Sequence, residues 1–381
     1  MPRDFTVQEE ISPPVVISIL NWNGWRETIE CLKSVRKLNY PNYLAVIVDN
    51  GSADDSADKI KAWAEQSLGS GHILVDYHRE IALQGGEERT EAALGQNPSP
   101  ARLVLIRNED NLGFAGGNNV TIQYALRRSQ PADYVFLLNN DATVDPDCLR
   151  HLLQVGRQAQ AGIMGAVIKD SESGHVFFTG WVGSLPLLRQ FFSPLFSFRL
   201  GLPNPEEGFQ VSYWVSGAGM LVARDVLEAV RESTGHYFDD ALFLYEEELQ
   251  LCGQARRLGY RTVVVSRALV YHREASASGG PANPILSYYC TRNRVRVAGL
   301  LVPWPLRMLF PAFHIPIALR EALRQLLRGN HRAALAILLG LVDGYLGVGG
   351  KWKYHDQEVR RSVAGWVGSA PLSGQIPKER M

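Results

Sequence analysis

The sequence predicts an α/β protein with a doubly wound sheet and a helical C-terminal extension. Short, continuous apolar runs such as VVISIL (residues 15–20) and YLAVIVDN (residues 43–50) are typical of parallel strands that are buried on both faces. Between such runs lie segments with helical spacing of apolar residues, for example residues 26–38, so strands and helices alternate. From residue 284 onward the chain is predicted to form helices separated by prolines and glycines.

The remaining elements of residues 1–283 follow the same alternation. An acidic turn caps a helix in GSADDSADKIKAWAEQ, and HILVDY and RLVLIRN are further strands. Between these two strands, the polar segment at about residues 78–101 is predicted to be an inserted loop. A glycine-rich turn, NLGFAGGNN, leads into a helix, and DYVFLLNND is the next strand. After an aromatic, proline-rich stretch (181–214), the domain is expected to end with the strand VSGAGMLVA, the helix EEELQLCGQARRLG and the strand-like YRTVVVSRALVYH.

Composition and charge are those of a globular, cytoplasmic protein. Of the 381 residues, 46% are hydrophobic and 20% are charged, and the formal net charge is zero. No nucleic-acid partner is expected. The N-terminal segment MPRDFTVQEEISPP is polar and acidic, unlike a secretory signal, and the four scattered cysteines favour reduced thiols. The C-terminal part differs, because residues 291–381 contain 14 Lys or Arg and 5 Asp or Glu, a net of +9.

Polar residues stand at the ends of three predicted strands: Asn21, Asn23, Asp49, Asn50, Asn139, Asn140 and Asp141. Each alone is more often a cap or a turn residue, but ligands of open α/β sheets bind at the carboxyl ends of strands. Together these residues therefore predict a binding crevice. The first strand is not followed by GxGxxG, and the sequence has no GxxxxGK[ST], so neither a dinucleotide site nor a P-loop is expected.

The segment YEEELQLCGQARRLG places consecutive glutamates at the start of a predicted helix. On a helix, Glu248 lies on the apolar stripe that contains Leu251, whereas Glu247 shares a polar face with Gln250 and Gln254. A carboxylate at the head of an apolar stripe is placed at a cleft, where partial burial raises its pKa toward a value suited to a general base. The alternative is a solvated helix start that the helix dipole favours.

The order of these motifs resembles glycosyltransferase family 2, of the GT-A fold, and especially its rhamnosyltransferase-like branch. The resemblance covers about residues 14–300, through ISILNWNGW, VIVDNGSADDS, NEDNLGFAGGNN, LLNNDATVDPD, GAGMLVARDVL, FLYEEELQLC and LVYHREAS. It implies that residues 1–283 are a catalytic domain that binds a nucleotide-diphosphate sugar, such as dTDP-rhamnose or a UDP-sugar. It also implies Mn²⁺ or Mg²⁺ as the cofactor and a glycan or lipid-linked acceptor.

The resemblance also implies which residues bind the donor. Asp49 matches the acid that contacts the nucleotide base or ribose, with Asn50 beside it and Asn21 and Asn23 on the neighbouring loop. The residues that match the glycine-rich turn lining the nucleotide and sugar pocket are Gly116, Gly117, Asn118 and Asn119.

The expected metal site departs from the family pattern. Asn139, Asn140 and Asp141 take the place of the DxD motif, of which only the last acid is kept, and His272 matches a histidine near the metal and the diphosphate. Because Mg²⁺ and Mn²⁺ take substrate oxygens and waters as ligands, Asp141 and His272 can supply the protein's share. We therefore expect the metal and the donor to bind together.

Glu247 and Glu248 match the Glu-Asp pair of the family, in which Glu248 takes the position of the catalytic base. The implied reaction is a single in-line displacement with inversion. The family usually has another acid where this chain has Gln250, which puts a second carboxylate for positioning the acceptor in doubt. Two alternatives stay open. A sugar nucleotidyltransferase would need a basic loop after the first strand, where NWNGWRET offers only Arg26, and a non-catalytic sugar-nucleotide-binding module would explain the missing acids.

The basic extension at 284–381 is predicted to contact membranes. It combines Trp304, Phe310 and many leucines with arginines, a composition suited to peripheral binding at an anionic surface on the inner face of the cell membrane. The alternatives are helices that pack on the catalytic domain and a homodimer contact. The arginines expected at the membrane are Arg292, Arg294, Arg296, Arg307, Arg320, Arg324 and Arg328.

Overall fold

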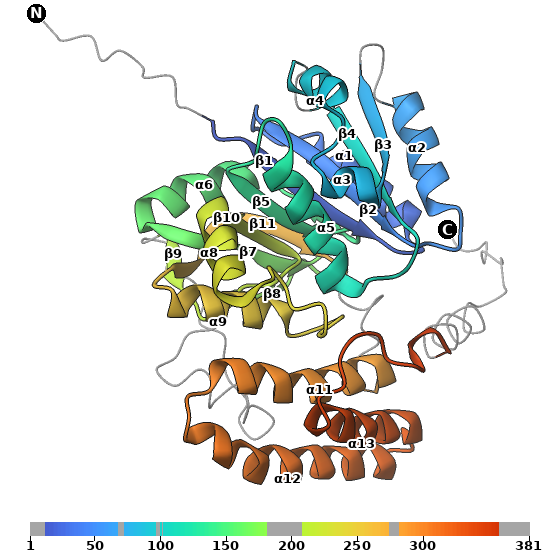
Figure 1. The fold of residues 1–381 in the computed structure, drawn as a ribbon, viewed down its shortest axis with the longest axis vertical. Helices are drawn as coiled ribbons and strands as arrows, with labels where there is room; N and C mark the ends of the chain where they lie inside the picture. Colours follow the sequence, from blue (N-terminus) through green and yellow to red (C-terminus); the bar gives the residue numbers. More distant parts are fainter. Residues whose placement is uncertain are drawn as a thin grey trace, which may run out of the picture.

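The computed structural model describes residues 12–67, 72–96, 100, 102–180, 208–273 and 282–357. The N-terminal segment, most of the aromatic stretch 181–214 and residues 358–381 lie outside these ranges. The first five strands, all predicted from the sequence, are β1 (Val15–Asn21), β2 (Tyr43–Asn50), β3 (Ile73–His78), β4 (Arg102–Asn108) and β5 (Tyr134–Asn139). They are parallel neighbours in the order β3-β4-β2-β1-β5, which confirms the predicted α/β sheet (Figure 1).

The second half of the sheet is mixed. It contains β6 (Ala142–Val144), β7 (Ala161–Asp170), β8 (Val176–Phe178), β9 (Phe209–Val211), β10 (Gly219–Ala223) and β11 (Arg261–His272). Strand β10 lies antiparallel between β5 and β7, and β11 runs parallel to β7. The short β6 pairs antiparallel with the end of β11, which brings the residue after Asp141 opposite His272.

Helices cover both faces of the sheet, each over its own hydrophobic cluster. One face carries α1 (Trp25–Val35), α2 (Ser56–Ser67) and α6 (Cys148–Ala159). The opposite face carries α3 (Arg79–Leu83), α4 (Glu88–Gly95), α5 (Gly113–Arg127), α8 (Arg224–Thr234) and α9 (Glu247–Arg257).

The prediction of a loop at 78–101 was wrong, because helices α3 and α4 lie within this segment. Their apolar residues Ala82 and Leu94 are fully buried. One of the polar residues of the segment, Glu91, is buried in the protein. Its carboxylate accepts a hydrogen bond from Arg128 at 2.9 Å and another from the Tyr124 hydroxyl at 2.7 Å. In the sequence, the residues of a buried ion pair cannot be distinguished from surface charges, so the composition of the segment predicts a loop.

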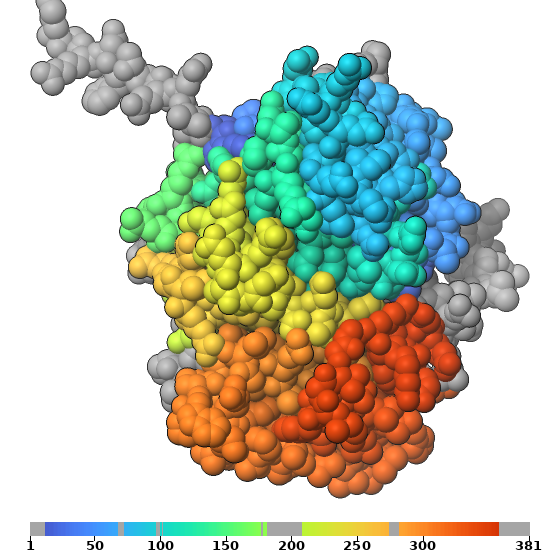
Figure 2. Space-filling model, in the orientation of Figure 1, coloured from blue at the N-terminus to red at the C-terminus, as the bar shows by residue number. Residues whose placement is uncertain are grey.

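The helical extension consists of α11 (Pro284–Leu301), α12 (Leu306–Leu327) and α13 (His331–Tyr345), as the sequence predicts. Asn283 caps α11, since its side chain accepts a hydrogen bond from the N–H of Ile285 at 2.8 Å. Figure 1 shows α11 between the α/β domain and α12, and Figure 2 shows the extension as a layer at one end of the molecule. No helix in the described ranges combines the length and apolarity needed to cross a membrane.

Candidate active site

The register of the parallel strands brings the predicted strand-end residues to one edge of the sheet. Asn21 at the end of β1 pairs with Asp49 on β2, and Leu20 pairs with Asn139 on β5. Asn50 pairs with Asn108 on β4. Because the strands are parallel and in register, their polar ends form one continuous row, as the sequence predicts.

A hydrogen-bond network fixes Asp49 at this edge. The carboxylate is 5% exposed, and its Oδ1 accepts from Asn21 Nδ2 and from the Ser52 hydroxyl, both at 2.7 Å. Thr28 extends the network, since its hydroxyl donates to Asn21 Oδ1 at 2.8 Å and accepts from Asn140 Nδ2 at 3.1 Å. Ser52 and Thr28 were missed in the sequence, where a hydroxyl on a loop or a helix start carries no distinguishing signal.

Asn23 and Asn50 shape the loops around this network. Asn23 has a left-handed backbone (φ 53°), and its Oδ1 accepts from the N–H of Ala53 at 2.8 Å, which ties together the loops after β1 and β2. The side chain of Asn50 is fully engaged, because it donates to Asn111 and Gly113 and accepts from Asn108 and the N–H of Leu112.

The glycine-rich residues expected in a turn lie inside helix α5 instead. Gly116 and Gly117 are buried, and a Cβ on Gly117 would collide with Leu20 of β1. Asn118 accepts from the Ser18 hydroxyl at 2.9 Å, and Asn119 donates to the carbonyl of Phe238 at 2.8 Å. These residues therefore join α5 closely to β1 and to the segment before α9. The expected turn was wrong because a run of small residues also suits a helix packed closely on a sheet.

Asp141 and His272 meet, although 131 positions of sequence separate them. The carboxylate Oδ1 lies 3.0 Å from the imidazole Nε2, and the two side chains are 12% and 15% exposed. Asn139 Nδ2 lies 3.2 Å from the same imidazole nitrogen. The pairing of β6 with β11 creates this contact by placing the strand end of β5 beside the end of β11.

Glu248 reaches the same edge through Gly217. The glutamate is the second residue of α9 and accepts a hydrogen bond from the N–H of Gly217 at 3.0 Å. Gly217 precedes β10, whose first residue, Gly219, pairs antiparallel with Leu138, so the chain before β10 continues past the end of β5. A Cβ on Gly217 would lie 2.6 Å from the carboxylate, so glycine gives the carboxylate room for this approach. Burial raises the pKa of Glu248, and the Gly217 N–H partly offsets this effect.

Glu247 is in a different environment. It is 1% exposed, and its Oε1 has no hydrogen-bond partner among the described residues. Burial, followed by the neighbouring charge of Glu248, raises the pKa of Glu247 well above its usual range. The polar face predicted for Glu247, Gln250 and Gln254 exists, but it is buried. Glu248, in contrast, is partly exposed.

A strained loop positions α9. Phe243, Tyr245 and Glu246 all have left-handed backbones (φ 65°, 67° and 74°), which side chains other than glycine rarely adopt. Asn293 of α11 stabilises the loop by donating to the carbonyls of Leu242, Leu244 and Tyr245 at 3.0, 2.9 and 2.8 Å.

Neighbouring arginines of α11 act with Asn293. The buried Arg292 donates to the carbonyls of Ala241 and Leu242, Arg294 pairs with Glu246 at 3.2 Å, and Arg296 pairs with Asp239. The predicted membrane role of Arg292 was wrong, because its side chain is buried and binds the loop that leads to Glu247 and Glu248. Arg294 and Arg296 form ion pairs with acids of the same loop, and their membrane role stays a prediction.

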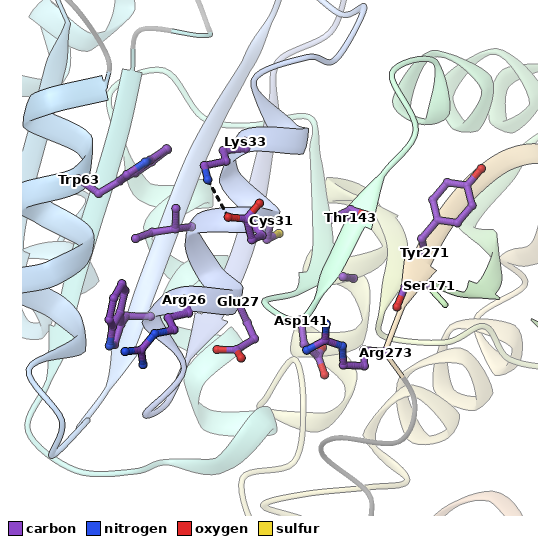
Figure 3. Close-up of a pocket in the computed structure, with 14 residues that line it drawn as sticks. Arg26, Glu27, Cys31, Lys33, Trp63, Asp141, Thr143, Ser171, Tyr271 and Arg273 are labelled. Carbon is purple, nitrogen blue, oxygen red and sulfur yellow. Dashed lines mark hydrogen bonds and ion pairs between the residues drawn. The ribbon is translucent and has the colours of Figure 1, made fainter. Parts of the chain in front are cut away.

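A cavity of about 620 Å³ borders the site on the side of α1. Figure 3 shows Arg26, Glu27 and Trp63 on one side and Asp141, Thr143 and Arg273 on the other. Asp141 is the predicted site residue that lines it. Since α9 packs on the opposite face of the sheet, this cavity does not lie between Asp141 and Glu248.

Comparisons with known proteins identify the family of the chain. Residues 83–284, more than half of the chain, match the family described as "Glycosyltransferase like family 2", and residues 15–93 match "Glycosyl transferase family 2". The chain belongs to glycosyltransferase family 2. It therefore contains a glycosyltransferase domain, and the family membership predicted from the motifs is confirmed.

Two named glycosyltransferases are similar to this chain over about half of its length. The low-salt glycan biosynthesis hexosyltransferase Agl10 of Haloferax volcanii is 24% identical over 49% of this chain and 61% of its own length. The N-acetylglucosaminyl-diphospho-decaprenol L-rhamnosyltransferase of Mycobacterium tuberculosis is 26% identical over 55% of this chain and 71% of its own. This chain thus spans less than two thirds of the haloarchaeal relative.

Solved structures confirm the GT-A fold of this family 2 chain. A mannosyltransferase from Pyrobaculum calidifontis, solved with GDP-Man and Mn²⁺, has a TM-score of 0.51 at 13% identity and covers 97% of this chain and 84% of its own. GalNAc-T7, solved with UDP, GalNAc and Mn²⁺, also has a TM-score of 0.51 at 13% identity, over 94% of this chain and 58% of its own.

The residues present fit a divalent ion only if the donor shares in binding it. Within the described residues, no group of three or more His, Cys, Asp or Glu side chains is arranged to hold a metal. Asp141 and His272 supply two donor atoms 3.0 Å apart. Two neighbouring ligands of an octahedral ion, each at about 2.1 Å, lie about 3.0 Å from one another. The pair therefore fits part of a coordination sphere whose other ligands are diphosphate oxygens and waters.

Proposed function

We propose that this protein transfers a sugar from a nucleotide-diphosphate sugar to a hydroxyl group of a glycan or lipid-linked acceptor, with inversion. The observation that carries the proposal is the contact of Asp141 with His272, at 3.0 Å, in a family 2 domain. The contact lies at the sheet edge that Glu248 approaches through Gly217. Family membership argues against the alternative of a sugar nucleotidyltransferase.

Glu248 is the proposed base. Its Oε1 is oriented by the Gly217 N–H, and its raised pKa makes it a better proton acceptor than an ordinary surface carboxylate. The acceptor hydroxyl gives its proton to Glu248 as the oxygen attacks the anomeric carbon from the face opposite the diphosphate. A single displacement of this kind inverts the configuration. Glu247 lies beside Glu248 at the helix start, where burial raises the pKa of Glu247 well above the usual range.

The diphosphate leaves at the Asp141–His272 pair. Asp141 and His272 would hold Mn²⁺ or Mg²⁺, which when bound neutralises charge that develops on the leaving diphosphate. Asn139 Nδ2 lies 3.2 Å from the imidazole Nε2 of His272 and so borders the proposed metal site. The network of Asp49, Asn21 and Ser52 is proposed to receive the nucleotide, since it forms the adjacent strand ends.

The proposal for the donor and the acceptor is based on the name of a related enzyme. The mycobacterial relative is named for L-rhamnose transfer to a decaprenol-linked sugar, which favours dTDP-rhamnose, or otherwise a UDP-sugar, as the donor here. A lipid-linked acceptor would place the reaction at the inner face of the cell membrane.

The test is incubation of the protein with labelled dTDP-rhamnose, UDP-sugars and GDP-mannose, in the presence of Mn²⁺ or Mg²⁺ and a lipid extract as the acceptor. A labelled, lipid-extractable product that requires the metal is expected. Donor binding without transfer to any acceptor would favour the non-catalytic sugar-nucleotide-binding module instead.

A further inference from the structure

Helix α12 exposes its most hydrophobic side. Met308, Leu309, Leu323 and Leu327 are 62%, 55%, 55% and 79% exposed. A helix packed in a water-soluble bundle has the opposite arrangement, with bulky apolar side chains inward. The buried side of α12 is instead mostly small or polar: Phe310, His314, Ala318, Ala322 and Gln325.

Helix α13 repeats this arrangement. Leu335, Leu338, Val342 and Leu346 are 57%, 40%, 54% and 73% exposed and follow a helical spacing, so they form one stripe. Helix α11 packs against both α12 and α13 and separates α12 from the α/β domain. The exposed side of α12 therefore points away from the catalytic domain, and α13, which packs against α12, carries the second exposed stripe. These two exposed sides are hereafter called the apolar face. An exposed apolar surface of this extent marks an interaction site.

The charges around the apolar face are mainly positive. Between residues 304 and 348, the acids are Glu321 and Asp343, which accept hydrogen bonds from Arg324 and from the Tyr288 hydroxyl. A second copy of this chain on the same face would bring arginines against arginines, whereas an anionic lipid surface complements them. The exposed basic residues are Arg307, Arg320, Arg324, Arg328 and Arg332.

We propose that the apolar face docks on an anionic lipid membrane. Helices α12 and α13 lie in the plane of the interface, with their leucines among the acyl chains and their arginines at the headgroups. Because α11 also binds the loop before Glu248, docking holds the catalytic domain at a fixed height above the surface. The proposal is independent of the proposed function, since its residues lie outside the candidate active site.

Co-sedimentation of the full chain with lipid vesicles tests the proposal. The protein should bind vesicles of phosphatidylcholine with phosphatidylglycerol, and binding should weaken as salt is raised. The double variant Leu323→Glu, Leu327→Glu should lose about 100-fold or more in partition, since each buried leucine contributes about 1.5–3 kcal/mol. The control Val211→Glu changes a side chain of β9 that is 55% exposed, and it should bind as the original does.

Two further measurements make the result decisive. Both leucines are exposed, so the double variant should unfold at the original temperature, which separates lost binding from lost folding. Arg328→Glu with Arg332→Glu should remove most of the preference for phosphatidylglycerol. The proposal is overturned if the protein does not bind these vesicles or if the leucine variant still binds them. It is also overturned if the protein forms a dimer without lipid that the leucine variant disperses and vesicles do not displace, because the apolar face would then be a subunit interface.

Discussion

Replacing Glu248 with glutamine removes a proton acceptor and little else. The amide oxygen of glutamine can still accept the Gly217 N–H, which lies 3.0 Å from Oε1, so the start of α9 should be preserved. General base catalysis contributes about 10²- to 10⁴-fold to a rate, or about 2.7 to 5.5 kcal/mol in the activation barrier. We therefore expect turnover to fall at least about 100-fold, with donor affinity nearly unchanged. Initial rates of transfer and calorimetry of donor binding measure the two quantities.

Glu247→Gln is the matched control, because it makes the same chemical change one residue earlier. Glu247 is 1% exposed and cannot reach an acceptor hydroxyl, so turnover should change by no more than a few-fold. If Glu247→Gln abolished transfer and Glu248→Gln did not, the assignment of the base would be refuted. Equal losses of donor affinity and turnover in Glu248→Gln would show that the residue binds the donor instead.

Two other predictions concern His272 and Glu247. His272→Ala should weaken metal-dependent binding of a nucleoside diphosphate at least about tenfold, and the exposed His175→Ala should not; titration calorimetry would show equal affinities if the account is wrong. The raised pKa of Glu247 should make the free energy of unfolding fall as pH rises above 4.5, by up to about 1.4 kcal/mol per pH unit until its folded pKa is passed. Urea denaturation at pH 5, 6 and 7 should therefore find a shallower fall in Glu247→Gln, and identical slopes would contradict this.

The strand ends were predictable because register follows from the hydrophobic pattern. Apolar runs buried on both faces fix where β1, β2 and β5 stop, so Asn21, Asp49 and Asn139 fall at one edge by alignment alone. The contact of Asp141 with His272 depends on β6, a strand of three residues that pairs with the far end of β11. No local pattern indicates such a pairing, and only the motif resemblance pointed to His272.

The burial around α9 was not predictable from helical periodicity. Gln250 and Gln254 have the spacing of a solvated face, but they are 0% and 6% exposed. The extension packs across this helix, where Gly253 allows Leu301 to approach closely. A polar stripe has the same spacing whether it meets water or an internal network.

The basic run of α11 is a second example of this limit. Arg292 lies in a segment whose basic and apolar composition is typical of a membrane contact. Its side chain is nevertheless 2% exposed and binds backbone carbonyls of the loop before Glu247. The spacing of residues in the sequence indicates which of them share a face of a helix. What that face contacts depends on tertiary packing.

We infer that Asp141 and a bound nucleoside diphosphate share one divalent ion. Calorimetric titration of UDP, GDP and dTDP into the protein, with and without MnCl₂, tests it directly when repeated with Asp141→Asn. Asparagine can keep the contact with His272 but lacks the charge, so the fold should be preserved. We predict that Mn²⁺ raises the affinity of the original protein for at least one nucleotide about tenfold or more and does not do so for the variant. An undiminished Mn²⁺ effect in Asp141→Asn would contradict the account.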